Sequence, residues 1–300
     1  MRNVLIGITG PTASGKTKLS IDLAKELKCD VISCDSRQFY KELKIGTAVP
    51  SKNELRSVKH HLIQHISVVD NYTVKDFEKD AIKIINTQFK KKEFIILSGG
   101  SNLFLDSVIY GIDDMPSIDK VLRKNLNNEF EMYGIKHIQE KLKNVDPEYY
   151  KRVDLNNPRR IIRALEVSIT SGKPYSSFTG KKHLKNNDFD VLIFAISIDR
   201  KKLYDKIDKR VDSMIKDGLV DEVRTLSKFR LFNALNTVGY KEIFSYLDGS
   251  VTLEYAISEI KKNTRRYAKR QITWLRSKKN IIWVNEKTSL KNLIDQISLK

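Results

Sequence analysis

Cysteine, proline and glycine are scarce in this chain. Its 300 residues include 2 cysteines, 6 prolines and 13 glycines, too few for a disulfide-rich scaffold, a proline-rich disordered chain or a collagen-like repeat. No secretory signal is recognisable, so we expect Cys29 and Cys34 to be free, buried thiols in a reducing cytoplasm.

Long hydrophobic runs are also missing. The longest strongly apolar run is Val191–Ile198, whereas a membrane-spanning helix needs about 20 residues. Apolar residues still make up 40% of the chain, enough for a sizeable core. We therefore expect a cytoplasmic protein, most simply a monomer, that does not enter a membrane.

Acidic residues are outnumbered. The chain has 55 Lys and Arg against 37 Asp and Glu, a formal net charge of +18. Such an excess does not select a fold, but it indicates a polyanionic partner such as nucleic acid or an anionic membrane surface.

Short apolar runs alternate with amphipathic helical patterns along most of the chain. The runs that predict buried strands are Val4–Ile8, Val31–Cys34, Phe94–Leu97, Val191–Ile198 and Ile281–Val284. The alternation predicts an α/β fold with a doubly wound parallel sheet. Residues 112–186 show helical patterning but no convincing strand. We therefore expect a core domain of residues 1–111 and 187–300 and a helical insertion domain of residues 112–186.

A glycine-rich loop follows the first predicted strand and fits the pattern G-x-x-x-x-G-K-[ST]. It consists of Gly10, Pro11, Thr12, Ala13, Ser14, Gly15, Lys16 and Thr17. Such a loop turns successive backbone N–H groups toward one bound di- or triphosphate. The Lys16 ammonium would contact the phosphates, and the Thr17 hydroxyl could hold Mg²⁺.

Two acidic positions near strand ends bear on the chemistry. Asp35 directly follows the second predicted strand, where it could bind magnesium or accept a proton from a nucleophile. The strand Phe94–Leu97 is followed by Ser98-Gly99-Gly100 and not by the acid of a typical ATPase. Asp199 is a weaker substitute, since it also suits the N-cap of a helix beginning at Arg200.

Basic residues gather on two predicted helices. Between Lys261 and Lys279 there are nine Lys or Arg and no acid, and most of this segment belongs to a helix expected from Thr252 to Ser277. The residues of its basic face that we expect to contact phosphates are Arg265, Arg266, Lys269 and Arg270. A second cluster in the insertion comprises Arg159, Arg160 and Arg163.

Three histidines, His60, His61 and His65, lie close together in the sequence. No cysteine pair or carboxylate completes a credible set of metal ligands with them, and we expect them in loops or on the surface.

Several segments together resemble the tRNA dimethylallyltransferases, also called tRNA isopentenyltransferases. Besides the glycine-rich loop, the resembling segments are Asp35–Tyr40, Ile45–Ala48, Gly99–Leu103, Arg159–Glu166, Val238–Glu242 and Ala268–Arg276. They cover nearly the whole chain in the order usual for the family.

The resemblance implies transfer of a dimethylallyl group from its diphosphate to N6 of adenine 37 in tRNA. It implies Asp35 as the general base, and Thr17 and Arg210 as residues that stabilise the leaving diphosphate together with Mg²⁺. The positions that it implies for contact with the flipped-out base and its neighbours are Ser36, Arg37, Gln38 and Ser101. It also implies a tRNA contact in the insertion by Asn157, Pro158, Arg159, Arg160, Ile161, Ile162 and Arg163.

The chain departs from the family's pattern beside the Asp35 segment. Glu42 stands where glycine is usual, Lys44 where an acid is usual, and Gln64 where aspartate is usual. Two other functions remain open on sequence: a phosphate-loop kinase or prenyltransferase acting on a small molecule such as adenylate, and an RNA-binding protein with an inactive loop.

Overall fold

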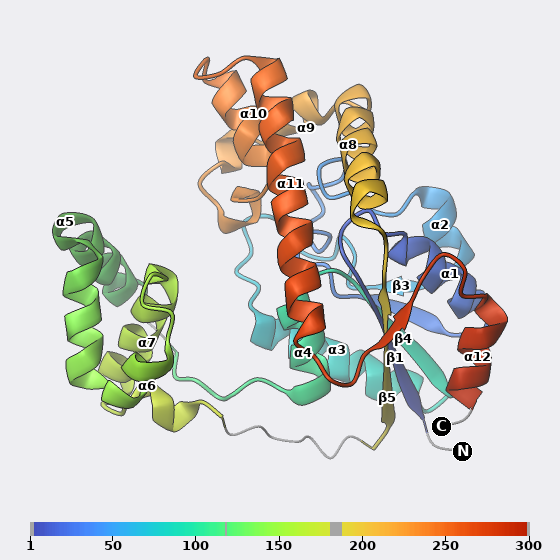
Figure 1. The fold of residues 1–300 in the computed structure, drawn as a ribbon, viewed down its shortest axis with the longest axis horizontal. Coiled ribbons are helices and arrows are strands. Elements are labelled where there is room, and N and C mark those ends of the chain that lie inside the picture. Colours follow the sequence, from blue (N-terminus) through green and yellow to red (C-terminus); the bar gives the residue numbers. More distant parts are fainter. Residues whose placement is uncertain (1–2, 118, 181–187, 299–300) are drawn as a thin grey trace. The chain divides into compact units, whose positions relative to one another are not determined.

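A parallel sheet with helices packed around it forms the larger part of the fold (Figure 1). Within residues 3–117, 119–180 and 188–298, which the computed structural model describes, the sheet has six strands. They are β1 (Val4–Thr9), β2 (Asp30–Ser33), β3 (His60–His61), β4 (Phe94–Ser98), β5 (Asp190–Ile196) and β6 (Ile282–Val284). Their order across the sheet is β3-β2-β4-β1-β5-β6, and every pair is parallel. The predicted α/β fold with a parallel sheet is therefore confirmed.

The central strand β1 is apolar along its length because both of its faces are covered. All six of its residues are buried. Val4, Ile6 and Ile8 pack in one cluster with residues of the helices at either end of the chain. On the opposite face, a Cβ built on Gly7 would lie 3.6 Å from the side chain of Leu105. Helices on both faces are what a doubly wound sheet requires.

Twelve α-helices occur among the described residues. They are α1 (Lys16–Glu26), α2 (Lys52–Ser57), α3 (Val74–Gln88), α4 (Asn102–Tyr110), α5 (Lys120–Val145), α6 (Pro147–Arg152), α7 (Pro158–Ser171), α8 (Arg200–Lys216), α9 (Leu219–Thr225), α10 (Tyr240–Leu247), α11 (Leu253–Arg276) and α12 (Leu290–Ser298). Asp199 accepts hydrogen bonds from the backbone N–H groups of Lys201 and Lys202, which confirms it as the N-cap of α8. Among the described helices, none combines the length and the apolar character needed to span a bilayer.

The chain divides into two compact units, Met1–Ile109 with Asn186–Lys300 and Tyr110–Lys185. The second unit holds α5, α6 and α7, and its described residues contain no strand. Its core includes Leu126, Leu142 and Leu165. From sequence we expected the limits of this insertion at residues 112 and 186, and the second limit lies outside the described residues.

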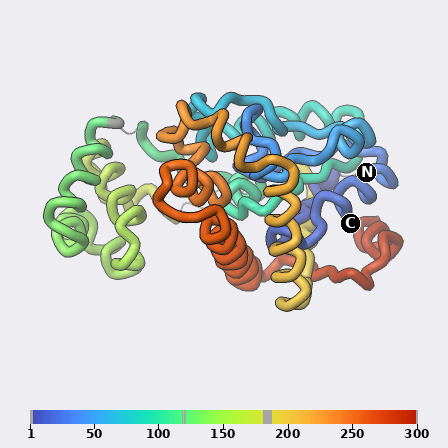
Figure 2. The backbone as a smooth tube through the Cα atoms, turned by 90° about the horizontal axis from the view of Figure 1, so that it is seen from above, coloured from blue at the N-terminus to red at the C-terminus, as the bar shows by residue number. Residues whose placement is uncertain are grey.

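In the first unit, α11 lies beside α8 (Figure 1, Figure 2). Ala268 of α11 packs against Leu203 and Ile207 of α8. Further along α11, Ile260 joins a second cluster that contains the fully buried Tyr240 of α10. This packing fixes one face of α11 and leaves the rest of its circumference for other contacts.

The histidines and cysteines differ in how well they were predicted. His60 and His61 form β3 and are half-buried, so the expectation of loop or surface positions is wrong for this pair. A two-residue strand carries too short a pattern to be recognised. No group of three or more potential metal-binding side chains occurs among the described residues. Cys29 and Cys34 are free and buried, as predicted.

Candidate active site

The glycine-rich loop curls between the end of β1 and the start of α1. Gly10 and Gly15 have φ angles of 150° and 96°, a region that favours glycine, and Ala13 also has a positive φ of 62°. The Lys16 ammonium donates hydrogen bonds to the carbonyl oxygens of Gly10 (3.0 Å) and Pro11 (2.8 Å). The ammonium is therefore held above the loop, where a bound phosphate could replace these carbonyls.

A cavity of about 340 Å³ opens over this loop. Its lining residues are Thr12, Ala13, Gly15, Lys16, Thr17, Asp35, Gln38, Ala48, Gly100, Lys206, Arg210, Tyr267 and Gln271. The structure thus brings together Thr17, Asp35 and Arg210, the three side chains expected to act in catalysis, although the last two come from distant parts of the chain, the loop after β2 and α8.

Positive charge dominates this cavity, which we call the anion cavity. Burial lowers the pKa of Lys16 from its usual 10.5 to about 8; the Asp35 carboxylate opposes this shift and the Arg210 guanidinium adds to it. Burial also lowers the pKa of Arg210, again opposed by Asp35. Three cations, Lys16, Lys206 and Arg210, surround one carboxylate, so a multiply charged anion would relieve their mutual repulsion.

A second cavity of about 540 Å³ adjoins the first. Thr12, Asp35, Arg210 and Tyr267 line both cavities. The second cavity, which we call the acceptor cavity, also includes Arg270 of α11. Asp35 therefore lies where a group bound in one cavity would meet a group bound in the other.

Hydrogen bonds hold the segment around Asp35. Its Oδ1 accepts a hydrogen bond from the backbone N–H of Arg37 at 3.1 Å. The Ser101 hydroxyl accepts from the backbone N–H of Ser36 and donates to its hydroxyl, both at 3.0 Å. The Arg37 guanidinium donates to the backbone carbonyls of Asn233 and Ala234. Of the predicted contact residues, Ser36 and Arg37 line the acceptor cavity and Gln38 lines the anion cavity. Ser101 lines neither cavity but is hydrogen-bonded to Ser36.

Gln271 is a residue of this site that sequence reasoning missed. The side chain is 3% exposed. Its Oε1 accepts a hydrogen bond from the backbone N–H of Thr12 (2.9 Å), and its Nε2 donates to the carbonyl oxygen of Gly100 (2.8 Å). A glutamine on the core-facing side of a helix was the signal available. Gln271 attaches the glycine-rich loop and the loop after β4 to α11.

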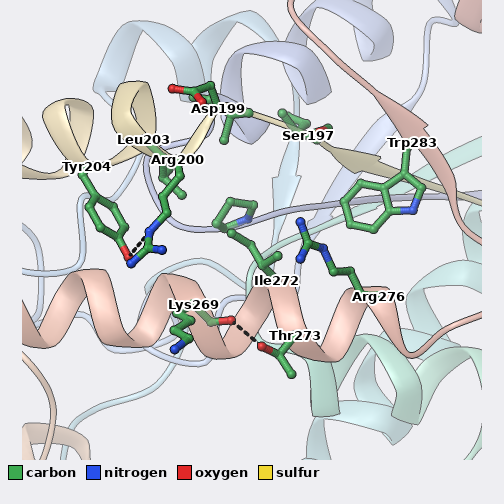
Figure 3. A pocket seen from close by; sticks show the side chains of 13 residues that line it. Ser197, Asp199, Arg200, Leu203, Tyr204, Lys269, Ile272, Thr273, Arg276 and Trp283 are labelled. Atoms are coloured by element: carbon green, nitrogen blue, oxygen red, sulfur yellow. Dashed lines mark hydrogen bonds between the residues drawn. The ribbon is translucent and has the colours of Figure 1, made fainter.

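The structure separates the four predicted basic residues of α11. Arg265 makes two hydrogen bonds with the Asp208 carboxylate of α8, at 2.8 and 3.1 Å, and is only partly exposed. Arg266, Lys269 and Arg270 are exposed. Arg270 lines the acceptor cavity, whereas Lys269 lines a different pocket of about 620 Å³ with Arg200 and Arg276 (Figure 3).

In the insertion unit, the predicted contact segment begins α7. The Asn157 side chain accepts a hydrogen bond from the backbone N–H of Arg160, and Pro158 occupies the first turn. Ile161 and Ile162 are buried in the core of the unit. Only the arginines offer charge to a polyanion: Arg159 and Arg160 are exposed, and the half-exposed Arg163 lies 3.5 Å from the buried Glu166 carboxylate.

Comparison with known proteins gives one consistent family. The model of the IPP transferase family matches residues 38–278. The chain is 52% identical over 300 residues to the tRNA dimethylallyltransferase of Christiangramia forsetii, covering 100% of this chain and 99% of that protein. It is 49% identical over 299 residues to that of Flavobacterium johnsoniae, covering 98% and 96%.

Solved structures agree with this result. A eukaryotic dimethylallyltransferase acting on tRNA matches with a TM-score of 0.84 and 26% identity, covering 99% of this chain and 80% of that chain. The tRNA isopentenylpyrophosphate transferase of Bacillus halodurans matches with a TM-score of 0.70 and 36% identity, covering 99% and 94%.

Proposed function

The chain belongs to the IPP transferase family, and on that premise we propose that it transfers a dimethylallyl group from dimethylallyl diphosphate to N6 of adenine 37 in tRNA. The observation that carries the proposal is the position of Asp35 in the wall of both the anion cavity and the acceptor cavity. A diphosphate in one and an adenine in the other would place the reacting atoms beside this carboxylate.

In the proposed reaction, the adenine N6 forms a bond to the first carbon of the dimethylallyl group. The bond from that carbon to the diphosphate oxygen breaks, and the diphosphate leaves with the electron pair. The proton lost from N6 passes to the Asp35 carboxylate, which acts as the general base. The adenine must leave its stack to enter the acceptor cavity, as in other enzymes that modify bases.

The cations of the anion cavity stabilise the leaving group. Negative charge builds on the diphosphate as the carbon–oxygen bond breaks, and Lys16 and Arg210 both line the cavity that would hold it. Because these groups are already in place, their stabilisation needs little rearrangement during the reaction. Backbone N–H groups of the glycine-rich loop add to it.

The residues at the anion cavity fit a magnesium ion carried by the substrate. Mg²⁺ usually keeps several waters and binds substrate phosphates with one or two protein oxygens. Thr17 supplies a hydroxyl in the cavity wall, next to the position proposed for the diphosphate. When bound, the ion would neutralise charge on the leaving diphosphate, while Thr17 would orient it.

Exposed arginines on each unit provide the proposed contacts with tRNA. On α11 these are Arg266 and Arg270, and on α7 they are Arg159 and Arg160. Guanidinium groups bind phosphate oxygens in a forked geometry that suits an RNA backbone. Because the proposed substrate is tRNA, we propose that the enzyme acts in the cytoplasm. We propose that it does so as a monomer.

The test of this function uses dimethylallyl diphosphate labelled in its prenyl group, with tRNA, AMP and ATP as alternative reactants. We expect label in tRNA, located at adenine 37 by mass spectrometry of its nucleosides. Label in AMP, or phosphoryl transfer from ATP, would replace the proposal by one of the two small-molecule activities. Binding of tRNA without any transfer would favour an RNA-binding protein with an inactive loop.

The variant Asp35→Asn tests the role of the carboxylate. Because the amide has the same shape but cannot accept the proton, we expect a loss of turnover of about 10² to 10⁴. The dissociation constants for tRNA and inorganic pyrophosphate should change little. Retention of full turnover by this variant would remove Asp35 from the mechanism.

A further inference from the structure

The loop of residues 43–48 forms part of both cavity walls and has no assigned role. Gly46 and Thr47 line the acceptor cavity, and Ala48 lines the anion cavity. This loop lies in the region where Glu42 and Lys44 depart from the pattern usual for the family. The glycine and the acid usual at positions 42 and 44 are absent here, so other contacts must fix the position of the loop.

One carboxylate holds the loop from outside. The Oε2 of Glu222, on α9, accepts hydrogen bonds from the backbone N–H groups of Lys44 (3.2 Å) and Ile45 (2.8 Å). Its Oε1 accepts from the backbone N–H of Gly46 (3.1 Å) and from the Tyr240 hydroxyl (2.7 Å). Three consecutive backbone donors and one phenol thus converge on Glu222. An ionised carboxylate, which only accepts, satisfies all four.

The tyrosine also limits where the loop can lie. Tyr240 is completely buried, and burial, together with Glu222, raises its pKa, so the phenol remains protonated as a donor. A Cβ built on Gly46 would lie 2.6 Å from the Tyr240 ring. The loop therefore passes directly against the ring, which only glycine permits at this position.

A second set of hydrogen bonds joins the loop to the catalytic segment. The Gln38 side-chain amide donates to the carbonyl oxygens of Thr47 (3.2 Å) and Ala48 (3.0 Å). The backbone N–H of Gln38 donates to the carbonyl oxygen of Asp35 at 3.0 Å. Glu222 is therefore connected, through the loop and Gln38, to the backbone of Asp35.

We propose that Glu222 is a positioning residue. It fixes the loop of residues 43–48 and, through Gln38, the placement of Asp35 against the acceptor base. This inference rests on the proposed function. Glu222 lines neither the anion cavity nor the acceptor cavity. Its loss should therefore slow the chemical step with both substrates bound and leave the binding of each substrate largely intact.

The test compares Glu222→Gln with the wild type in single-turnover reactions at saturating tRNA and dimethylallyl diphosphate. The glutamine amide keeps the shape of the side chain but turns two donors toward groups that are themselves donors. We expect the single-turnover rate to fall by about tenfold or more, since small misplacements of reacting groups have large effects on rate. The dissociation constants for tRNA and inorganic pyrophosphate should each change by less than about threefold.

Two further variants control for a general loss of structure. Asp248→Asn removes a carboxylate that pairs with Arg230 at the surface of the same unit, and we expect an unchanged single-turnover rate. Tyr240→Phe removes one of the four donors to Glu222, so it should lower the single-turnover rate below that of the wild type, but by less than Glu222→Gln does. If Glu222→Gln fails to fold, the rate of Tyr240→Phe relative to the wild type still tests the inference.

Three results would overturn the inference. The first is a folded Glu222→Gln variant that reacts at the wild-type rate. The second is an Asp248→Asn variant whose single-turnover rate falls as much as that of Glu222→Gln. The third is an affinity of Glu222→Gln for pyrophosphate that falls together with its rate. Each differs from failure of the proposed function, in which the wild type itself transfers no label to tRNA.

Discussion

At the scale of single residues, the site depends on groups whose properties are set by their surroundings. Lys16 is the clearest example, since burial brings its pKa to about 8. Asp35 gains its importance from lying in the wall shared by two cavities. Gln271 uses both ends of its amide, one for the glycine-rich loop and one for Gly100. The motif and the position after a strand single out Lys16 and Asp35 in the sequence, whereas no such signal marks Gln271.

The lowered pKa of Lys16 predicts how pyrophosphate binding depends on pH. The ammonium, which attracts the anion, predominates below about pH 8 and is lost above it. Bound pyrophosphate favours the ammonium, so binding should take up a proton above that pH. We expect the dissociation constant for pyrophosphate to rise by about tenfold between pH 7 and 9, measured by calorimetry.

Lys16→Arg is the control for this measurement. Its guanidinium stays charged throughout the range, while ionisation of pyrophosphate itself affects both proteins equally. The ratio of the two dissociation constants should therefore change with pH. A constant ratio would show that Lys16 does not titrate in this range.

At the scale of elements, α11 performs three tasks on different parts of its surface. Ala268 and Ile260 pack against other helices. Gln271 holds the loops of the anion cavity. From Lys261 onward, the remaining surface of the helix carries basic side chains and no acidic ones, but Arg265 is already paired with Asp208. The basic surface available to RNA is therefore narrower than the sequence pattern indicates.

This division of α11 predicts different effects from neighbouring arginines. The double variant Arg266→Gln with Arg270→Gln should weaken tRNA binding and reduce the slope of log affinity against log salt by about two, about one for each lost phosphate contact. The single variant Arg265→Gln should leave the salt slope nearly unchanged, because this side chain is held by Asp208. Filter binding between 50 and 200 mM salt, the range in which such dependence is pronounced, distinguishes them. An equal effect of Arg265 would contradict the assignment.

At the scale of the whole molecule, the two units have separate hydrophobic cores. One contains the sheet and both cavities, and the other contains α5, α6 and α7. In the second unit, Glu166 is 1% exposed and pairs with Arg123, whose Nη2 donates to it at 2.7 Å. Arg163 lies on the same carboxylate at 3.5 Å. This buried carboxylate orients two arginines at the surface of the insertion.

Glu166→Gln should therefore act on the second unit alone. Loss of a buried acceptor for charged donors costs about 1 to 3 kcal/mol, and we expect faster hydrogen exchange in residues 120–171 without a change in β1 or β4. Affinity for tRNA should fall, while the dissociation constant for pyrophosphate stays as in the wild type.

The exposed Glu148, which lies 3.8 Å from Arg152, provides the matched control. Glu148→Gln should alter neither hydrogen exchange nor tRNA affinity. If Glu166→Gln weakened pyrophosphate binding, the two units would not act independently in substrate binding.

The sequence by itself determined the parts of this protein whose signals are local. Buried strands appear as short apolar runs, the glycine-rich loop has a fixed spacing, and helices such as α8 and α11 have clear caps. Asp35 was identified because it follows a strand, since the ends of parallel strands meet at one edge of a sheet. These features depend on neighbours within a few residues along the chain.

Only the tertiary structure decided which side chains meet across long separations. The pairing of Arg265 with Asp208, the attachment of Gln271 to Gly100 and the four hydrogen bonds to Glu222 all join segments far apart in the chain. A charge or an amide has the same appearance in the sequence whether it faces solvent, a partner or a substrate. Its function is set by the packing of elements that bring a partner within hydrogen-bonding distance, and that packing leaves no local pattern.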